Sequence, residues 1–196
     1  GQTCYICYGE GDEDEGLVRG CACRGENGSA HVSCLARAAQ VAVELDAFTG
    51  WARWITCGQC KQRYHGVVSC ALGWACWKTY LGRPETDWAR LHAMTELGHG
   101  LSGVGHNEDA LSVREAELSM RRRLGDPEDN ILAVQGNLAA TYLALGRAEQ
   151  ALRLKGEVYS GLLKLLGEEH LETLRAAHNH ANSLNRLRRF EESKAF

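Results

Sequence analysis

The strongest constraint on this chain is a set of cysteines and one histidine near its start. Seven of its nine cysteines lie in the first sixty residues. A Cys-x2-Cys couple allows both thiolates to reach one metal ion from a single tight turn. Structural zinc is held by four cysteine or histidine ligands, so eight ligands suffice for two ions. The eight form four couples: Cys4 and Cys7, Cys21 and Cys23, His31 and Cys34, Cys57 and Cys60.

Two other uses of cysteine fit the sequence poorly. Small disulfide-rich domains are usually secreted, whereas this sequence shows no apolar signal segment and has an odd number of cysteines. A thioredoxin-type redox site needs a Cys-x2-Cys couple that opens a helix within a βαβ pattern. No such pattern surrounds Cys4 or Cys57. The sequence therefore predicts zinc ligands.

Composition indicates a globular protein without a nucleic-acid or membrane role. Of the 196 residues, 44% are hydrophobic and 24% charged, which is typical of a soluble domain. Proteins that bind nucleic acid usually carry an excess of basic residues, whereas the net charge of this chain is −3. The longest apolar run, residues 67–77, is shorter than the roughly 20 residues of a membrane span. We expect a soluble protein of the cytoplasm or nucleus, with neither nucleic acid nor a membrane span.

Between the ligand couples the sequence predicts a loop, a helix and a small aromatic core. Residues 10–16 are acidic and glycine-rich, which indicates a solvated loop, and residues 24–29 indicate a turn. Leu17 and Val18 suit a short strand. Residues 30–45 carry apolar side chains at helical spacing, so a helix beginning near His31 places His31 and Cys34 on one face. Because small zinc domains have little core, Trp51, Trp54 and Tyr64 are expected to pack inside it.

The ligand pattern resembles RING-CH fingers more closely than PHD fingers. One residue separates Cys21 from Cys23, and seven separate Cys23 from His31, as in RING-CH fingers; PHD fingers have a longer second couple and a shorter gap. Three phrases are similar to that family's signature, and the resemblance covers about residues 3–65. They are Cys21-Ala22-Cys23-Arg24-Gly25, His31-Val32-Ser33-Cys34-Leu35 and Cys57-Gly58-Gln59-Cys60-Lys61.

This resemblance implies a cross-braced finger of the α+β class with two zinc ions. One ion would be held by Cys4, Cys7, His31 and Cys34, and the other by Cys21, Cys23, Cys57 and Cys60. Because protein fills every coordination position, the zinc is structural and no catalytic residue is assigned. The family's activity implies an E3 ubiquitin ligase that docks a ubiquitin-conjugating enzyme carrying ubiquitin. The residues that would contact this enzyme are Ile6, Trp54 and Lys61.

The second part of the chain contains an internal repeat. Residues 81–85 (Leu-Gly-Arg-Pro-Glu) recur as residues 124–128 (Leu-Gly-Asp-Pro-Glu) and, without proline, as residues 166–169. The spacing of 41 to 43 residues accommodates two helices, and both prolines are expected to mark helix starts. Residues 129–145 have helical periodicity, with small side chains at 133, 136 and 140 that suit close packing. Such repeats build an α-solenoid.

The phrase formed by residues 137–147 (Asn-Leu-Ala-Ala-Thr-Tyr-Leu-Ala-Leu-Gly-Arg) is similar to tetratricopeptide (TPR) repeats, especially those of kinesin light chains. This resemblance implies an all-α TPR-like solenoid that binds a protein or peptide substrate. The expected domains are a finger at 1–66 and repeats at 67–196. The repeats comprise a degenerate unit at 67–105, units at 106–146 and 147–188, and the start of a further, truncated unit at 189–196.

Other reactive or charged residues of this part have structural interpretations. Cys70 and Cys76 are expected to be buried thiols. Arg121, Arg122 and Arg123 could form a basic patch with Arg186, Arg188 and Arg189, but cations are favoured at helix C-termini, so solvated helix ends are the preferred interpretation. His178 and His180 lie on different faces of a helix, which disfavours a metal pair.

Three functions remain open at this point. The first is a ubiquitin ligase whose finger recruits the conjugating enzyme and whose repeats capture the substrate. The second is an adaptor without enzymatic activity, in which zinc stabilises a platform for protein partners. The third and least favoured is a PHD-like reader of histone tails, which requires an aromatic or acidic cage beside a peptide groove.

Overall fold

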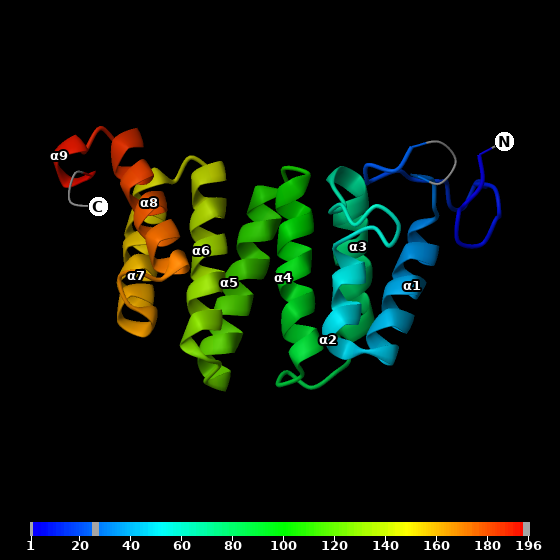
Figure 1. The fold of residues 1–196 in the computed structure, drawn as a ribbon, viewed down its shortest axis with the longest axis horizontal. Coiled ribbons are helices and arrows are strands. Elements are labelled where there is room, and N and C mark those ends of the chain that lie inside the picture. The colour runs from blue at the N-terminus through cyan, green and yellow to red at the C-terminus, as the bar shows by residue number, and fades with distance from the viewer. Residues whose placement is uncertain (1, 25–27, 194–196) are drawn as a thin grey trace. The chain divides into compact units, whose positions relative to one another are not determined.

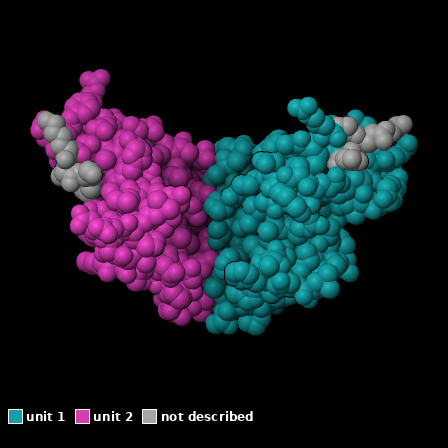
Figure 2. All heavy atoms as spheres, viewed as in Figure 1, with its two compact units in different colours: residues 1–106 teal, residues 107–196 magenta. Residues whose placement is uncertain are grey.

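The computed structural model describes residues 2–24 and 28–193, and these form two compact units, residues 1–106 and 107–196 (Figure 2). The first unit contains the finger together with the next two helices. The expected turn at 24–29 and the further unit at 189–196 fall partly outside the described residues. The domain boundary between residues 66 and 67 stays a prediction.

The finger consists of irregular loops around one long helix. The expected strand at Leu17 and Val18 is reduced to a single antiparallel bridge between Val18 and Ala30, and a second bridge joins Thr56 to Arg63. The helical elements of the finger are α1 (Val32–Leu45), α2 (Ala47–Gly50) and the 3₁₀ helix η2 (Trp51–Trp54).

Helix α1 begins directly after His31, as the sequence predicts. Its buried face is made by the side chains Leu35, Ala36, Ala39 and Val43, which recur at helical spacing. The first amides of a helix have no partner inside it. Here the Glu15 carboxylate accepts the Ser33 amide at 2.8 Å, which connects the acidic loop to the start of α1.

A pair of closely packed helices completes the first unit. They are α3 (Gly66–Tyr80) and α4 (Trp88–Gly103) (Figure 1). A Cβ atom added at Gly73 would lie 2.9 Å from the Glu96 carbonyl oxygen, so glycine permits this close approach. The expectation that Pro84 starts a helix is wrong. Helix α4 begins four residues later, where the Asp87 carboxylate caps the amides of Ala89 and Arg90.

The finger and the α3–α4 pair share one hydrophobic core. The Trp51 ring lies 5.4 Å from the Tyr80 ring and 5.1 Å from the Trp88 ring, centroid to centroid. At the other end of α3, a Cβ atom on Gly20 would come within 2.4 Å of the Val68 side chain. The predicted core aromatics Trp51, Trp54 and Tyr64 are all buried, which confirms their packing role.

The two cysteines that follow the finger differ in their surroundings. Cys76 is fully buried in the shared core, as the sequence predicts. Cys70 is half-buried on the same helix, so its predicted burial is only partly correct. All nine cysteines are free thiols. Across the described residues, no helix combines the length and apolar character needed to span a bilayer.

The second unit repeats a two-helix pattern. Successive helices α5, α6, α7 and α8 each pack on the next, around a core formed by α5, α6 and α7. Gly125, Gly146 and Gly167 follow three of the helices with positive φ angles, a conformation in which glycine is favoured. The bounds are α5 (Asn107–Leu124), α6 (Glu128–Ala144), α7 (Ala148–Leu166), α8 (Leu171–Arg186) and α9 (Phe190–Ser193).

The same polar link joins the two helices of each repeat. Arg114 on α5 donates to the Asn137 carbonyl oxygen and the Thr141 hydroxyl oxygen on α6. One repeat later, Lys155 on α7 donates to the Asn179 carbonyl oxygen and the Ser183 hydroxyl oxygen on α8. Each cation thus loses hydrogen bonds to water and gains hydrogen bonds to the neighbouring helix.

Two expectations for this unit are wrong. Arg121 is not a solvated helix end: it is 4% exposed and lies 2.9 Å from Glu117 and 2.7 Å from Asp126, because buried charges require partners. The small side chains of α6 do not mediate close packing either. Ala133 and Ala140 are exposed, and a Cβ atom added at Gly136 would meet nothing within 4 Å.

The shared core predicts unequal effects of removing two neighbouring aromatic rings. Trp51→Ala should lower the free energy of unfolding of residues 1–106 by about 3–5 kcal/mol, because it leaves a cavity between the finger and α3–α4. Phe48→Ala is the control, since Phe48 is 93% exposed. Urea unfolding followed by near-ultraviolet circular dichroism measures both. Equal stability of the two variants would contradict a shared core.

Candidate metal centre

The first predicted ligand set converges in space. The ligand atoms of Cys4, Cys7, His31 and Cys34 all lie within 4.8 Å of one another. The His31 Nδ1 atom is 3.4 Å from the Cys7 sulfur and 3.8 Å from the Cys34 sulfur. Tetrahedral zinc, with bonds of about 2.3 Å to sulfur and about 2.0 Å to nitrogen, separates such atoms by about 3.5 Å. The four residues therefore fit a zinc ion.

The orientation of the His31 ring is set by a backbone group. Its Nε2 atom lies 3.1 Å from the Glu10 carbonyl oxygen, which is a hydrogen-bond acceptor. This oxygen requires the Nε2–H tautomer, and so leaves the Nδ1 lone pair for the metal. Histidine ligands of zinc commonly donate their other N–H in this way. The acidic loop thus takes part in ordering the site, through the Glu10 carbonyl oxygen at His31 and through the Glu15 carboxylate at the neighbouring Ser33 amide.

The second predicted set converges as well. Cys21, Cys23, Cys57 and Cys60 place their sulfur atoms within the same 4.8 Å limit. The Cys23 and Cys57 sulfurs are 3.7 Å apart, close to the separation of two thiolates on one tetrahedral zinc ion. The Gln59 amide also donates to the Cys57 sulfur at 3.4 Å. The backbone of the turn thus faces the ligand sulfur.

The first and last couples form the same turn. The Tyr8 amide donates to the Cys4 carbonyl oxygen, and the Lys61 amide donates to the Cys57 carbonyl oxygen. Tyr8 and Lys61 have φ angles of 62° and 60°, which are unfavourable for residues other than glycine. The turn thus brings both cysteines of a couple to one metal, at the cost of a strained residue directly after it.

The pKa values of the thiols differ within each set. Burial raises the pKa of Cys4, but the Cys7 and Ile6 amides outweigh it and lower the value to about 6. The Gln62 amide lowers the pKa of Cys60 to about 7. Burial raises the pKa values of Cys23 and Cys34 to about 12. Each set therefore offers one ready thiolate and one thiol that must release its proton when zinc binds.

The two sets are interleaved along the chain. The first uses the first and third couples, and the second uses the second and fourth, as the cross-braced arrangement requires. With four protein ligands at each site, a bound zinc ion retains no open position for water or substrate. The site is therefore suited to holding the finger together rather than to hydrolysis. Among the described residues, these are the two groups of this kind.

The three predicted contact residues lie in different environments. Ile6 is half-buried and packs against the finger core. Lys61 is exposed, and its Nζ atom donates to the Gly58 carbonyl oxygen at 2.6 Å. Trp54 is 3% exposed, so it has little surface to offer a partner. Their role in binding the conjugating enzyme stays a prediction.

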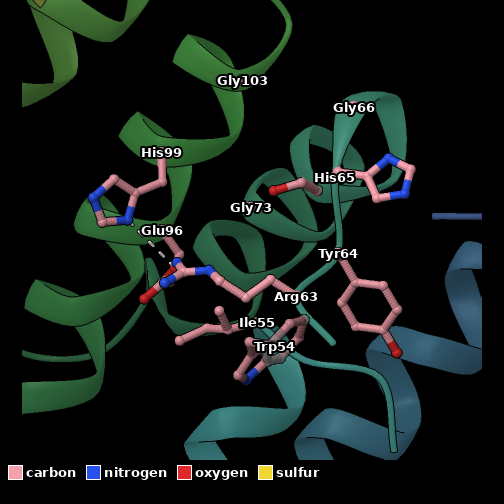
Figure 3. A pocket seen from close by; sticks show the side chains of 11 residues that line it. Trp54, Ile55, Arg63, Tyr64, His65, Gly66, Gly73, Glu96, His99 and Gly103 are labelled. Carbon is pink, nitrogen blue, oxygen red and sulfur yellow. Dashed lines mark ion pairs between the residues drawn. The ribbon is translucent and has the colours of Figure 1, made fainter. Parts of the chain in front are cut away.

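Trp54 instead lines a pocket of about 320 Å³ between the last loop of the finger and helices α3 and α4 (Figure 3). Arg63, Tyr64 and His65 come from the loop, whereas Glu96 and His99 come from α4. The Glu96 carboxylate lies 3.7 Å from the His99 Nδ1 atom. Sequence reasoning missed this pocket, because no local pattern indicates that α4 packs beside the finger.

Sequence reasoning also missed two supports of the metal sites. The Glu10 carbonyl oxygen that orients His31 is a backbone atom, so no residue type signals it. The Arg53 guanidinium covers Gly58: a Cβ atom added there would overlap it, at 1.6 Å from Nη1. A glycine between paired cysteines was the available signal, since it indicates close approach of another group.

Comparison with known proteins agrees with this geometry. Residues 4–62 match the family described as RINGv, the RING-variant domain. No curated protein matches the chain. The finger is therefore a RING-variant domain, a type of domain typical of E3 ubiquitin ligases, and its two candidate metal sites are consistent with two zinc ions. The match also favours the RING-CH interpretation of the ligand spacing over the PHD interpretation.

The helical part is similar to solved TPR-like structures. A crystal structure of nearly identical TPR-like repeats from a Podosopora anserina kinesin light chain is 19% identical, with a TM-score of 0.54. A substituted form of those repeats is 17% identical, with a TM-score of 0.55. Each match covers 84% of this chain and 70% of the other. The chain thus has TPR-like repeats after its RING-variant domain.

Removing one thiolate should disturb more than its own site. Cys57→Ala is expected to reduce bound zinc from two ions to one or none, because the interleaved sites order the same loops. Cys70→Ala is the matched control, since Cys70 belongs to neither ligand set. Elemental analysis of the purified proteins measures the zinc content. Two zinc ions in Cys57→Ala would refute the assignment.

The unequal thiol pKa values predict how zinc affinity depends on pH. Near pH 7 the metal-free Cys23 and Cys34 hold their protons, with pKa values of about 12, so each zinc ion displaces at least one proton. The apparent zinc affinity of each site should fall about tenfold or more for each unit of decreasing pH. Below about pH 6 the Cys4 thiolate is also protonated, which steepens the loss at the first site. Competition with a chromophoric chelator measures this slope, and a flat profile would contradict it.

Proposed function

We propose that this chain is an E3 ubiquitin ligase whose finger docks a ubiquitin-conjugating enzyme and whose repeats recruit the protein to be modified. The observation that carries the proposal is the pair of interleaved four-ligand sites within a RING-variant domain. Such sites fix the shape of a surface and leave no position for chemistry at the metal. A domain of this kind acts through what it binds.

The proposed contribution to catalysis is orientation. The thioester of the conjugating enzyme carries the reactive carbonyl carbon, and the nucleophile is an amine of the substrate. The amine attacks this carbon and loses a proton to solvent, an amide bond forms, and the thioester C–S bond breaks with release of the cysteine thiolate of the conjugating enzyme. Holding the two reactants in a productive arrangement accelerates such a step without a new nucleophile. No residue of the finger needs to touch the reacting atoms.

The proposed docking surface contains Ile6 and Lys61, supported from below by Trp54. Ile6 lies between the two ligands of the first couple and keeps part of its side chain exposed. Lys61 follows the last ligand and presents a cation on the surface, where it would hold ubiquitin against its carrier. Because Trp54 is buried, its proposed role is to keep the last loop in place rather than to supply contact area.

An adaptor without ligase activity is the second candidate. It is favoured by the internal engagement of two of the three contact residues. The Lys61 ammonium group is hydrogen-bonded to Gly58 within its own loop, and Trp54 packs into the core shared with α3 and α4. In this alternative the zinc ions order a platform, and the repeats bind protein partners.

A purified ubiquitination reaction separates these functions. The full chain is incubated with activating enzyme, ubiquitin and a panel of conjugating enzymes, and self-modification is followed by immunoblot. Ile6→Ala should reduce the rate by at least about tenfold, as expected for loss of a central apolar contact. Lys61→Ala should slow transfer while binding of the uncharged conjugating enzyme is retained.

Val67→Ala is the matched control, since Val67 is an exposed aliphatic residue beyond the last zinc ligand. Zinc content is measured for every variant, so that a folding defect is not mistaken for loss of docking. Full activity of Ile6→Ala would exclude the proposed surface. No ubiquitin chains with any conjugating enzyme, with two zinc ions still bound, would overturn the ligase and leave the adaptor as the remaining candidate.

A further inference from the structure

The second unit contains an apolar groove between α6 and α8. Its volume is about 500 Å³, which lies within the range of ligand-binding clefts. Helix α7 forms its floor through Val158, Leu162 and Leu166, while Leu132 and Ala176 line its sides. The walls are carbon-rich, and this size accommodates one bulky apolar side chain with part of its backbone.

The groove is open because α6 carries small residues where larger ones would fill it. Ala133 and Gly136 both line the groove. Helix α6 packs on α7, and α7 packs on α8, so α7 separates the two walls. A Cβ atom at Gly136 would have no neighbour within 4 Å, which shows that the glycine is not required by packing. Glycine inside a helix costs about 0.5–1 kcal/mol relative to alanine, so its presence has no stabilising explanation.

The cations that line the groove are engaged within the unit. The Arg175 guanidinium lies 2.8 Å from the Glu172 carboxylate. Lys155 is half-buried, and its Nζ atom donates to Asn179 and Ser183. His170 accepts the Glu172 amide through Nδ1 at 3.2 Å, which requires that nitrogen to be unprotonated. The Arg175–Glu172 pair is neutral as a whole, whereas Lys155 keeps its charge, because its acceptors are neutral oxygens, and is half-buried in the groove wall.

Carboxylates dominate one end of the groove. Helix α6 begins there, α7 ends there, and α8 begins there (Figure 1). Asp129 lines the groove, Glu128 precedes it, and Glu168 and Glu169 lie in the loop between Leu166 and His170. All four are exposed, and over the described residues none of them has an ion-pair partner within 4.0 Å. This end therefore presents four carboxylates that form no ion pair among the described residues, while Arg122, Arg123 and Lys164 lie at the adjoining ends of α5 and α7.

We infer that this groove binds a protein segment in which a bulky apolar residue is followed or preceded by lysines or arginines. The apolar side chain enters the space beside Gly136, where its burial supplies the affinity. The basic residues lie along the four carboxylates, where opposite charge selects them over acidic segments. The inference rests on the proposed role of the repeats in recruiting protein, but not on ligase activity.

The test selects binding sequences without any ubiquitination reagent. A random peptide library is displayed and panned against the full chain, and in parallel against Gly136→Leu, which fills the groove from a position free of steric conflict. Ser160→Leu is the matched control, because it adds the same side chain at an exposed position of α7 outside the groove. Helix content and the unfolding midpoint are recorded for each variant.

Enriched peptides should combine one leucine, phenylalanine or tryptophan with neighbouring lysines or arginines. A synthetic copy of the most enriched peptide should bind Gly136→Leu at least about tenfold more weakly than Ser160→Leu or the parent chain. A triple variant, Asp129→Asn with Glu168→Gln and Glu169→Gln, should weaken binding about threefold or more at low salt and less at high salt. Glu149→Gln, at the opposite end of α7, should leave it unchanged.

Four outcomes would overturn the inference. They are the absence of enrichment, enrichment of acidic or purely apolar peptides, equal binding by Gly136→Leu and Ser160→Leu, and an effect of salt that the triple variant does not reduce. Because the readout is peptide binding, failure here leaves the ubiquitination result unaffected. Conversely, a chain inactive in ubiquitination can still show the predicted preference.

Discussion

The finger depends on the convergence of ligands that lie far apart in the chain. Each set joins a couple from the first part of the finger to a couple from its second part, so neither site forms until those parts meet. Metal binding and folding are then a single event. Backbone groups around the ligands add no ligand of their own: the Glu10 carbonyl oxygen orients the His31 ring, and the Gln59 amide donates to the Cys57 sulfur.

The helices that follow the finger extend this ordered region. Trp51 belongs to the finger, yet its ring contacts Tyr80 at the end of α3 and Trp88 at the start of α4. Small zinc domains bury little apolar surface by themselves. Here the apolar core continues from Cys4 to Ala93, so the first helical pair serves as part of the finger's interior. This accounts for the bulky and irregular sequence of the first repeat.

Much of the metal site and the helical pattern could be predicted from sequence, because both are carried by spacing along the chain. The eight ligands, the start of α1 after His31 and the helix over residues 129–145 all follow from local rules. Features set by distant contacts could not be predicted. The pocket beside Trp54, for example, depends on the placement of α4.

The small residues of the helices show what a sequence pattern cannot distinguish. Alanine and glycine at helical spacing suit close packing, and Gly73 and Gly100 do permit α3 and α4 to approach each other. The same kind of residue at Ala133 and Gly136 lines an open groove instead. The sequence pattern shows only that the side chains at these positions are small. Whether a neighbouring helix or solvent occupies the space is decided by the tertiary structure.

The cationic links within the repeats have a consequence for how stability is distributed along the chain. Arg114 ties α5 to α6, and Lys155 ties α7 to α8, with the same carbonyl and hydroxyl acceptors at each junction. In a stack whose units contact mainly their neighbours, the stability of the stack is close to a sum over its units. Each repeat therefore has its own clamp between its two helices. Loss of Arg114 should loosen α5 from α6 and leave the link from α7 to α8 intact.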